Sequence, residues 1–246
     1  MSNLTATQTV GEIAAQYPAT VRVFQKHQID FCCGGKLPLK DACEKQGIVV
    51  DGLLAELGDA LAPAAGNAVD WNAAPLTGLI AHILSTHHEY LKAELPRLTE
   101  MVNKVMNVHG ERHPEVIQAG AVFFALRDEL GSHMMKEEMV LFPLIERLEN
   151  AARSGVAALP SHCGSVQNPI RVMVYEHDNA GAALEQMRSL SGNYTAPQDA
   201  CNTFRAMYHG LEELEADLHQ HIHLENNILF PRAVALEQRK GFLPLA

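Results

Sequence analysis

The stretch His133-Met-Met-Lys-Glu137-Glu-Met-Val-Leu-Phe-Pro143 recurs as His221-Ile-His-Leu-Glu225-Asn-Asn-Ile-Leu-Phe-Pro231. Each copy has a histidine and a glutamate four residues apart, followed at the same offset by Leu-Phe-Pro. Residues four apart on a helix lie on one face, one turn from each other. An imidazole nitrogen and a carboxylate oxygen therefore point the same way. One such pair is usually an ordinary surface contact, but two copies with identical spacing favour a metal site between facing helices of a bundle.

Composition narrows the class of protein. The chain has 246 residues, a hydrophobic content of 47% and a formal net charge of −10. Both sides of residue 66 are acidic, so we expect no nucleic-acid partner, because phosphate contacts need clustered Lys and Arg. The first residues lack the segments of a secretory signal, and no run of about 20 apolar residues could span a membrane. Five cysteines, two of them adjacent, predict a reducing cytoplasm rather than a disulfide framework.

Residues 1–62 are predicted to form a small helical domain. Thr9 and Glu12 have the spacing of a capping box before an apolar run, and Gly47 is expected to stop a later helix. The segment Asp30-Phe-Cys-Cys-Gly-Gly35 contains two glycines that permit a tight turn. A core this small is marginal alone, so we expect it to dock on the larger domain or on a partner. The small, breaker-rich residues 63–74 are interpreted as a linker.

Long amphipathic helices follow, and residues 75–246 are expected to form the second domain. Apolar residues recur at helical spacing throughout, and Pro96 is expected to kink the first of these helices. Long helices joined by such short connections pack antiparallel. No segment alternates with period two, so we predict an all-α fold, a four-helix bundle without a sheet. The expected helices cover residues 75–108, 114–150, 169–190 and 197–238.

The position of each histidine relative to its apolar stripe predicts whether it faces the core. Burying many imidazoles and two carboxylates is costly without strong partners, and a pair of metal ions removes that cost. Nitrogen and oxygen donors without thiolate suit iron, manganese or zinc, and two carboxylates able to bridge favour a di-iron centre. Helical position alone cannot separate His87 from His88. The other inward histidines are His109, His133, His177 and His221; those expected in solvent are His82, His113, His209, His219 and His223.

These motifs resemble those of the iron–sulfur cluster repair di-iron proteins, over essentially the whole chain. That family has a small N-terminal domain with an Asp-Phe/Tyr-Cys-Cys-Gly-Gly motif, here residues 30–35, before a hemerythrin-like four-helix bundle. The bundle signatures are the two repeats, together with Glu176-His177-Asp178 and the Val108-His109 end of the first helix. The resemblance implies two iron ions bridged by Glu137 and Glu225. It implies as terminal ligands His88, His109, His133, His177 and His221.

The resemblance also implies a function: repair of iron–sulfur clusters damaged by nitrosative or oxidative stress, through iron donation. Cys32 and Cys33 are then candidates for iron transfer or redox exchange, with Lys36 favouring the thiolate. The alternatives are an enzyme that reduces NO at the di-iron site and a hemerythrin-like sensor that binds NO or O₂. Expected partners are damaged iron–sulfur proteins, NO, O₂ or peroxide, and a second copy of the chain as a homodimer. We interpret the remaining cysteines, Cys43, Cys163 and Cys201, as structural or incidental.

Overall fold

The computed structural model describes residues 4–61, 69–155 and 162–239. Within these ranges the chain is helical, with no strand beyond an isolated bridge between Thr9 and Pro38. The predicted all-α fold is confirmed. None of the described helices is long and apolar enough to cross a membrane. Both ends of the expected domain 1–62, the first half of the expected linker 63–74 and the C-terminal end of the expected domain 75–246 lie outside the described residues.

The N-terminal domain contains four short α-helices, and its local sequence explains where they begin and end. The Thr9 hydroxyl accepts a hydrogen bond from the Glu12 amide at 3.3 Å, and the Glu12 carboxylate accepts one from the Thr9 amide at 3.0 Å. This is the predicted capping box. Gly47, at φ 67°, ends the third helix in the left-handed conformation that glycine adopts readily. The helices are α1 (Val10–Gln16), α2 (Val21–Lys26), α3 (Leu39–Gln46) and α4 (Val50–Ala60).

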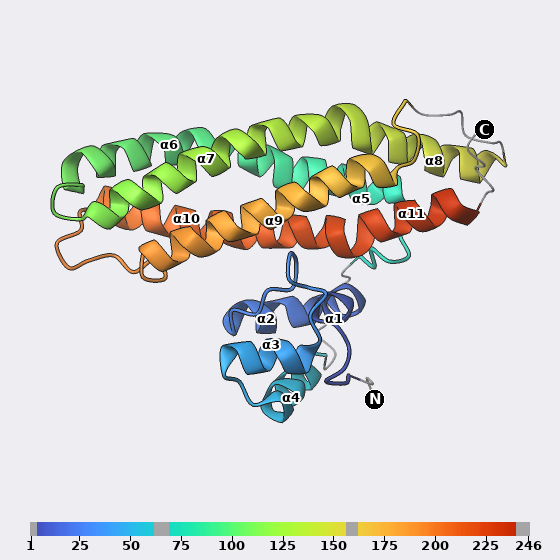
Figure 1. Ribbon diagram of the computed structural model, residues 1–246, viewed down its shortest axis with the longest axis horizontal. Helices are drawn as coiled ribbons and strands as arrows, with labels where there is room; N and C mark the ends of the chain where they lie inside the picture. Colours follow the sequence, from blue (N-terminus) through green and yellow to red (C-terminus); the bar gives the residue numbers. More distant parts are fainter. Residues whose placement is uncertain (1–3, 62–68, 156–161, 240–246) are drawn as a thin grey trace.

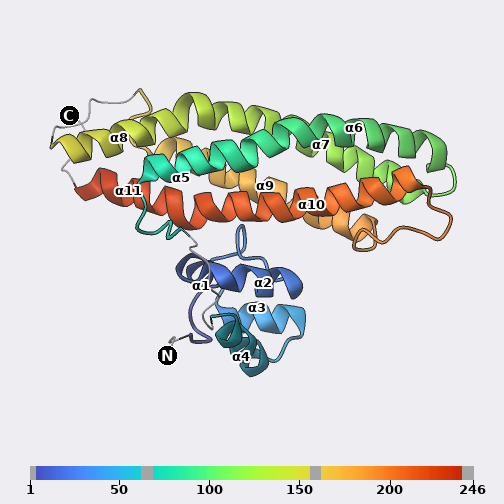
Figure 2. The same ribbon diagram turned by 180° about the vertical axis from the view of Figure 1, so that it is seen from behind.

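Four long rods form the antiparallel bundle, as Figures 1 and 2 show from opposite sides. Three of the rods contain a π-helical turn between two α-helices. The first rod is α5 (Leu76–Ile83), η2 (Leu84–His88) and α6 (Glu89–His109); the second is α7 (Pro114–Lys136), η3 (Glu137–Leu141) and α8 (Phe142–Ser154). The third is α9 (Gln167–Leu190); the fourth is α10 (Asn202–Leu224), η4 (Glu225–Leu229) and α11 (Phe230–Arg239).

One helix start was predicted wrongly. The fourth rod begins at Asn202 rather than at Pro197, because residues 197–200 form a turn in which the Ala200 amide donates to the Pro197 carbonyl at 3.0 Å. Cys201 is still extended, with φ −74° and ψ 170°. Proline is favourable in a first helical turn, but it equally favours a turn that precedes the helix. Within the first rod, α6 continues through Pro96.

The trailing Leu-Phe-Pro of each repeat explains two of the π-turns. Pro143 and Pro231 lack an N–H, and in an α-helix a proline ring clashes with the carbonyl four residues earlier. A wider turn relieves that clash. The amides of Phe142 and Phe230 accordingly donate to the carbonyls of Glu137 and Glu225, five residues back. Each repeated glutamate therefore begins a π-turn, a feature often found at functional sites.

The N-terminal domain packs against α10 and η4, on one side of the bundle (Figures 1 and 2). The Phe31 carbonyl accepts a hydrogen bond from Asn227 Nδ2 at 3.0 Å. Asn72, in the second half of the expected linker, donates to the Ala15 carbonyl at 2.6 Å. Buried apolar residues of both parts form one continuous cluster, which includes Phe24 and Leu218. The expected docking of the small domain on the bundle is therefore confirmed.

This docking overturns the prediction that His219 and His223 are solvated. The Phe31 ring lies edge-on to both imidazoles, with centroids 6.1 Å from His219 and 5.5 Å from His223. His223 is only 2% exposed. Both histidines lie off the stripe that faces the bundle core, but a second face of α10 is covered by the N-terminal domain. His209, on the same helix, is exposed as expected.

Burial of His223 predicts an acid-sensitive interface. Desolvation lowers the pKa of His223 to about 4, below the ordinary value of about 6.5. The unfolded chain therefore takes up this proton first as the pH falls from 6.5 to 4, and stability decreases over that window by roughly 3 kcal/mol. We expect His223→Gln to flatten this part of the pH profile of urea unfolding, because its amide does not titrate. His209→Gln is the control; equal flattening in both variants would contradict the assignment.

Candidate metal centre

Six of the predicted ligand side chains converge at the middle of the bundle, with all four rods contributing. None is more than 4% exposed. The apolar core forms two clusters, one with residues of α6, α7, α10 and most of the N-terminal domain, and one with residues of α5, α8 and α11 and Ala15 of α1. The six residues are His88 from η2, His133 from α7, Glu137 from η3, His177 from α9, His221 from α10 and Glu225 from η4.

The six side chains form two overlapping groups, each with its donor atoms within 4.8 Å of one another. The groups are His88, Glu137, His221 and Glu225, and His133, Glu137, His177 and Glu225. Glu137 presents Oε2 to His88 Nε2 and Oε1 to His133 Nε2, both at 3.3 Å. Glu225 presents Oε1 to His221 Nε2 at 3.3 Å and Oε2 to His177 Nε2 at 3.2 Å. Each carboxylate therefore directs one oxygen to each group, as a carboxylate bridging two ions does.

The unpaired atoms at this centre fit metal ions. Both oxygens of Glu137 and both of Glu225 are buried without a hydrogen-bond partner, and so are Nε2 of His88 and of His221. The nitrogens approach the oxygens without hydrogen-bond geometry, so their lone pairs converge. A buried carboxylate left without partners costs several kcal/mol. Cations held between these atoms would supply the missing interaction at every one of them.

A second layer of polar side chains holds the imidazoles. Nδ1 of His88 bonds Glu138 Oε1 at 2.8 Å, Nδ1 of His133 bonds Glu176 Oε2 at 2.9 Å, and Nδ1 of His177 bonds Asn226 Oδ1 at 2.9 Å. Such contacts orient a metal-binding imidazole with Nε2 toward the ion. The sequence analysis missed these three residues as partners. The repeat itself contained a signal, because Glu138 and Asn226 occupy the same position after each glutamate.

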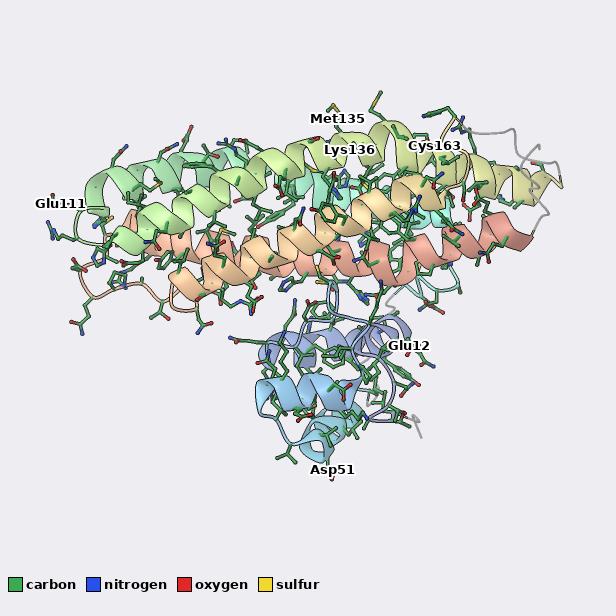
Figure 3. The ribbon with its side chains drawn as sticks, viewed as in Figure 1. Glu12, Asp51, Glu111, Met135, Lys136 and Cys163 are labelled. Carbon is green, nitrogen blue, oxygen red and sulfur yellow. The ribbon has the colours of Figure 1, made fainter. Side chains whose placement is uncertain are left out.

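Lys136 completes this layer on the second rod. Its ammonium group pairs with Glu176, and the neighbouring Met135, which is 59% exposed, projects from the face of the bundle opposite the N-terminal domain (Figure 3). Burial opposes ionisation of Glu176, but the bonds from Lys136 and His133 outweigh it and lower its pKa. Glu176 therefore stays an anionic acceptor for His133 Nδ1.

The electrostatics of the centre favour ionised carboxylates. Burial opposes ionisation of Glu225, yet the nearby imidazoles of His221 and His177 outweigh it and hold the pKa of that carboxyl well below its usual range. Burial likewise disfavours a charged His133, but the charges of Glu137 and Glu225 raise its pKa to about 9. Cation uptake near neutral pH must therefore displace a proton from His133, since only neutral imidazole binds a metal.

The structure distinguishes His88 from His87. His88 Nε2 faces Glu137, whereas His87 Nδ1 bonds Asp217 Oδ1 at 2.8 Å. His87 is also buried, and its ring stacks on that of His221 with centroids 5.2 Å apart. His87 therefore lies beside the centre, outside both donor groups.

The prediction that His109 is a ligand of this centre is wrong. His109 ends α6, 21 residues from His88, and a helix rise of 1.5 Å per residue separates the two by about 30 Å. Its Nε2 instead lies 3.2 Å from Cys201 Sγ, and its ring lies 5.2 Å from that of Phe204. The apolar stripe correctly predicted that His109 packs against a neighbouring part of the bundle. A position on the stripe, however, does not give the distance along the helix axis from that residue to the metal centre.

The loop that contains Cys32 and Cys33 contacts α9 at the turn that carries His177. Cys33 Sγ donates to the backbone carbonyl of His177 at 3.2 Å. Gly181, one turn further along α9, makes room for it, because a Cβ there would lie 2.9 Å from that sulfur. The expected turn is present, because the Leu37 amide donates to the Gly34 carbonyl at 3.0 Å. The thiol-bearing loop therefore touches the helix turn that carries a candidate ligand.

The prediction that Lys36 favours a thiolate is wrong for Cys32. The hydrogen bond with Cys33, burial and the charge of Asp30 together raise the pKa of the Cys32 thiol well above its ordinary value. Cys32 is only 3% exposed, whereas Cys33 is half-buried. Cys32 therefore rests as a neutral thiol.

A small cavity of about 20 Å³ adjoins the centre. That volume is enough for about one water-sized molecule. Its walls are mainly apolar, which suits a small uncharged ligand. The lining residues include His133, His177 and His221 together with Leu130, Ala180 and Leu218.

An antiparallel four-helix bundle with paired histidines and shared glutamates in its core defines a metal-binding protein of the hemerythrin type. Residues 79–233 match the hemerythrin HHE cation binding domain family, and residues 6–61 match a domain of unknown function, DUF542. The chain belongs to the family of iron–sulfur cluster repair proteins. It is 42% identical over 227 residues to the iron–sulfur cluster repair protein YtfE of Yersinia pseudotuberculosis serotype IB (strain PB1/+) and to that of Yersinia pestis (strain Pestoides F). Each match covers 92% of this chain and 96% of the relative.

Proposed function

We propose that the centre holds two iron ions, one in each donor group. Four neutral imidazoles and two carboxylates provide nitrogen and oxygen donors without thiolate, a set compatible with iron. Glu137 and Glu225 each offer one oxygen to either ion, so two negative charges are shared between two cations. The relatives are named as iron–sulfur cluster repair proteins, and this similarity favours iron over manganese or zinc.

We further propose that the protein repairs iron–sulfur clusters damaged by nitrosative or oxidative stress, by donating iron. The observation that carries this proposal is the contact of the Cys33 thiol with the backbone carbonyl of His177, a residue of the proposed iron site. The relatives are named as repair proteins. When bound, iron would supply an exchangeable ferrous ion. The chain's own residues keep the ligands buried, orient the imidazoles of His88, His133 and His177, and present the thiols of the N-terminal domain beside His177.

An iron–sulfur dehydratase inactivated by nitric oxide provides the test. Mixed without oxygen with the iron-loaded protein, it should regain activity and cluster absorption while the iron content of the donor falls in step. Metal-free protein is the control, and a matched amount of free ferrous iron is the reference. Recovery no faster than with free iron would reject donation by this protein.

The apolar cavity beside His133 and His177 supports a second candidate, binding or reduction of NO at the centre. A reductase would form nitrous oxide over many turnovers with an electron donor present. A repair protein would react with NO at most once per centre. Counting nitrous oxide per chain therefore separates the two functions.

We propose the cytoplasm as the location and damaged iron–sulfur proteins as the partners. Cys32, Cys33 and Cys43 are all unpaired thiols, as expected where glutathione and thioredoxin keep cysteines reduced. The acidic charge of the chain gives no basis for a nucleic-acid partner.

A further inference from the structure

The N-terminal loop carries its own group of metal-ligand atoms. One oxygen of Asp30 and the sulfurs of Cys32 and Cys33 all lie within 4.8 Å of one another. The two sulfurs are 3.7 Å apart, and Cys32 Sγ is 3.3 Å from Asp30 Oδ1. Two thiolates bound tetrahedrally to one ion at about 2.3 Å would have sulfurs roughly 3.8 Å apart. We propose that Asp30, Cys32 and Cys33 form a separate site for a single divalent transition-metal ion.

The protein holds these donors in place before any ion binds. Asp30 accepts hydrogen bonds from the amides of Cys32 at 2.9 Å and Gly34 at 2.7 Å, which fix its carboxylate beside the sulfurs. The bond from Asn227 to the Phe31 carbonyl fixes the loop from the opposite side. Since both domains constrain the loop, little reorganisation is needed to bring the three donors around one ion.

The donor set selects the class of cation. Two thiolates and one carboxylate suit borderline-soft divalent ions such as Fe²⁺, Zn²⁺, Co²⁺ and Cd²⁺, and they disfavour Mg²⁺ and Ca²⁺. Binding replaces the two thiol protons by one M²⁺ and releases both protons to solvent. With Asp30 already ionised, the loaded site carries one net negative charge. No oxidation or reduction is involved.

The site opens on a groove of about 600 Å³ between the two domains. Asp30 and Cys33 line this groove, so a fourth ligand can approach the ion from it. Lys45 and Arg188 line the groove, and so do Asp178, Glu185, Glu212 and Glu215. Because Arg188 is paired with Glu215 and carboxylates are in excess, the groove favours the approach of a cation. His219, another lining residue, places an imidazole near the same opening.

The purpose of this site rests on the proposed repair function. An ion leaving the bundle could be held by Asp30, Cys32 and Cys33 beside His177 before it passes to a target. Binding of the ion is nevertheless a property of the loop alone. It can be measured without any repair assay, so a failure of one claim is distinguishable from a failure of the other.

Titration of the reduced, metal-free full chain with Co²⁺ tests the site. Thiolate-to-cobalt charge transfer reports sulfur ligands only, so ions bound by the nitrogen and oxygen donors of the bundle contribute nothing to that band. We expect the band to reach the intensity of one sulfur-bound Co²⁺ per chain, whatever further Co²⁺ the bundle takes up. Cys32→Ser and Cys33→Ser should each reduce it by about half or more, and Asp30→Asn should weaken binding at least tenfold. Cys43→Ser, a buried thiol in the same domain, should leave it unchanged.

Three outcomes would overturn the proposal. They are absence of the charge-transfer band in the wild-type chain, its loss in Cys43→Ser, and its full retention in both Cys32→Ser and Cys33→Ser. Helicity measured by circular dichroism confirms that each variant is folded. Because Cys33 is half-buried and its serine variant keeps a hydrogen-bond donor for the His177 carbonyl, that variant remains informative if Cys32→Ser fails to fold.

Discussion

Replacing Glu225 by Gln is expected to remove both metal ions from the bundle, whereas replacing His88 by Asn removes only one. Glu225 offers Oε1 to the group with His221 and Oε2 to the group with His177, so its loss takes an anionic ligand from both positions at once. His88 belongs to one group only. Loss of a residue that merely supports a ligand already costs about 10–100-fold in metal affinity, and loss of a shared ligand should exceed that.

Iron per folded chain measures this difference. The wild type should bind about two irons per chain. After desalting, Glu225→Gln should keep about 0.5 iron per chain or less, roughly one quarter of the wild-type content, because its affinity falls more than 100-fold. His88→Asn should keep about one iron per chain, because only one donor group loses a ligand. Glu213→Gln is the matched control, because this glutamate is exposed on the same helix as His221. Equal losses in Glu225→Gln and His88→Asn would contradict shared carboxylates, even if both variants remain helical.

The double variant Cys32→Ser with Cys33→Ser is expected to abolish repair while the bundle keeps its iron. No sulfur belongs to either donor group of the bundle, and the hydrogen bond of Cys33 to His177 goes to the backbone carbonyl rather than to the imidazole. Serine preserves that contact as a hydroxyl donor. The change therefore removes thiol chemistry beside the centre and leaves the ligands in place.

Repair rate and iron content, measured on the same preparation, check this expectation. Repair should fall to the level given by free ferrous iron, with iron per chain unchanged within about 10%, a margin well inside the loss that a missing ligand causes. Cys43→Ser supplies the control for an ordinary buried thiol of the same domain. Unchanged repair in the double variant would reject any role of the cysteines, whatever the metal content.

The sequence predicted the centre well because the relevant information is local. His133 with Glu137, and His221 with Glu225, are four residues apart on a helix. Each pair lies on one helix face regardless of how the helices pack together. The apolar periodicity likewise located all four rods to within a few residues, apart from the late start of α10. Local spacing left His87 and His88 unresolved, because the π-turn that ends at His88 alters the rotation per residue.

Other features depend on contacts between distant parts of the chain. His109 satisfies the same stripe rule as His88, and only its position along the rod excludes it. His223 is buried because the Phe31 ring covers it, a contact between residues far apart in the sequence. Helical periodicity describes one helix at a time. It could not predict that the N-terminal domain covers the face of α10 that carries His223.

The central claim, a carboxylate-bridged pair of irons held by the two groups of donors, is tested most directly by Mössbauer spectroscopy combined with metal analysis on ⁵⁷Fe-loaded protein purified without oxygen. Two irons per chain are expected, in two non-haem environments of nitrogen and oxygen ligands, and the oxidised form should show antiferromagnetic coupling through the bridging carboxylates of Glu137 and Glu225. One iron per chain, or two irons without magnetic coupling, would contradict the account.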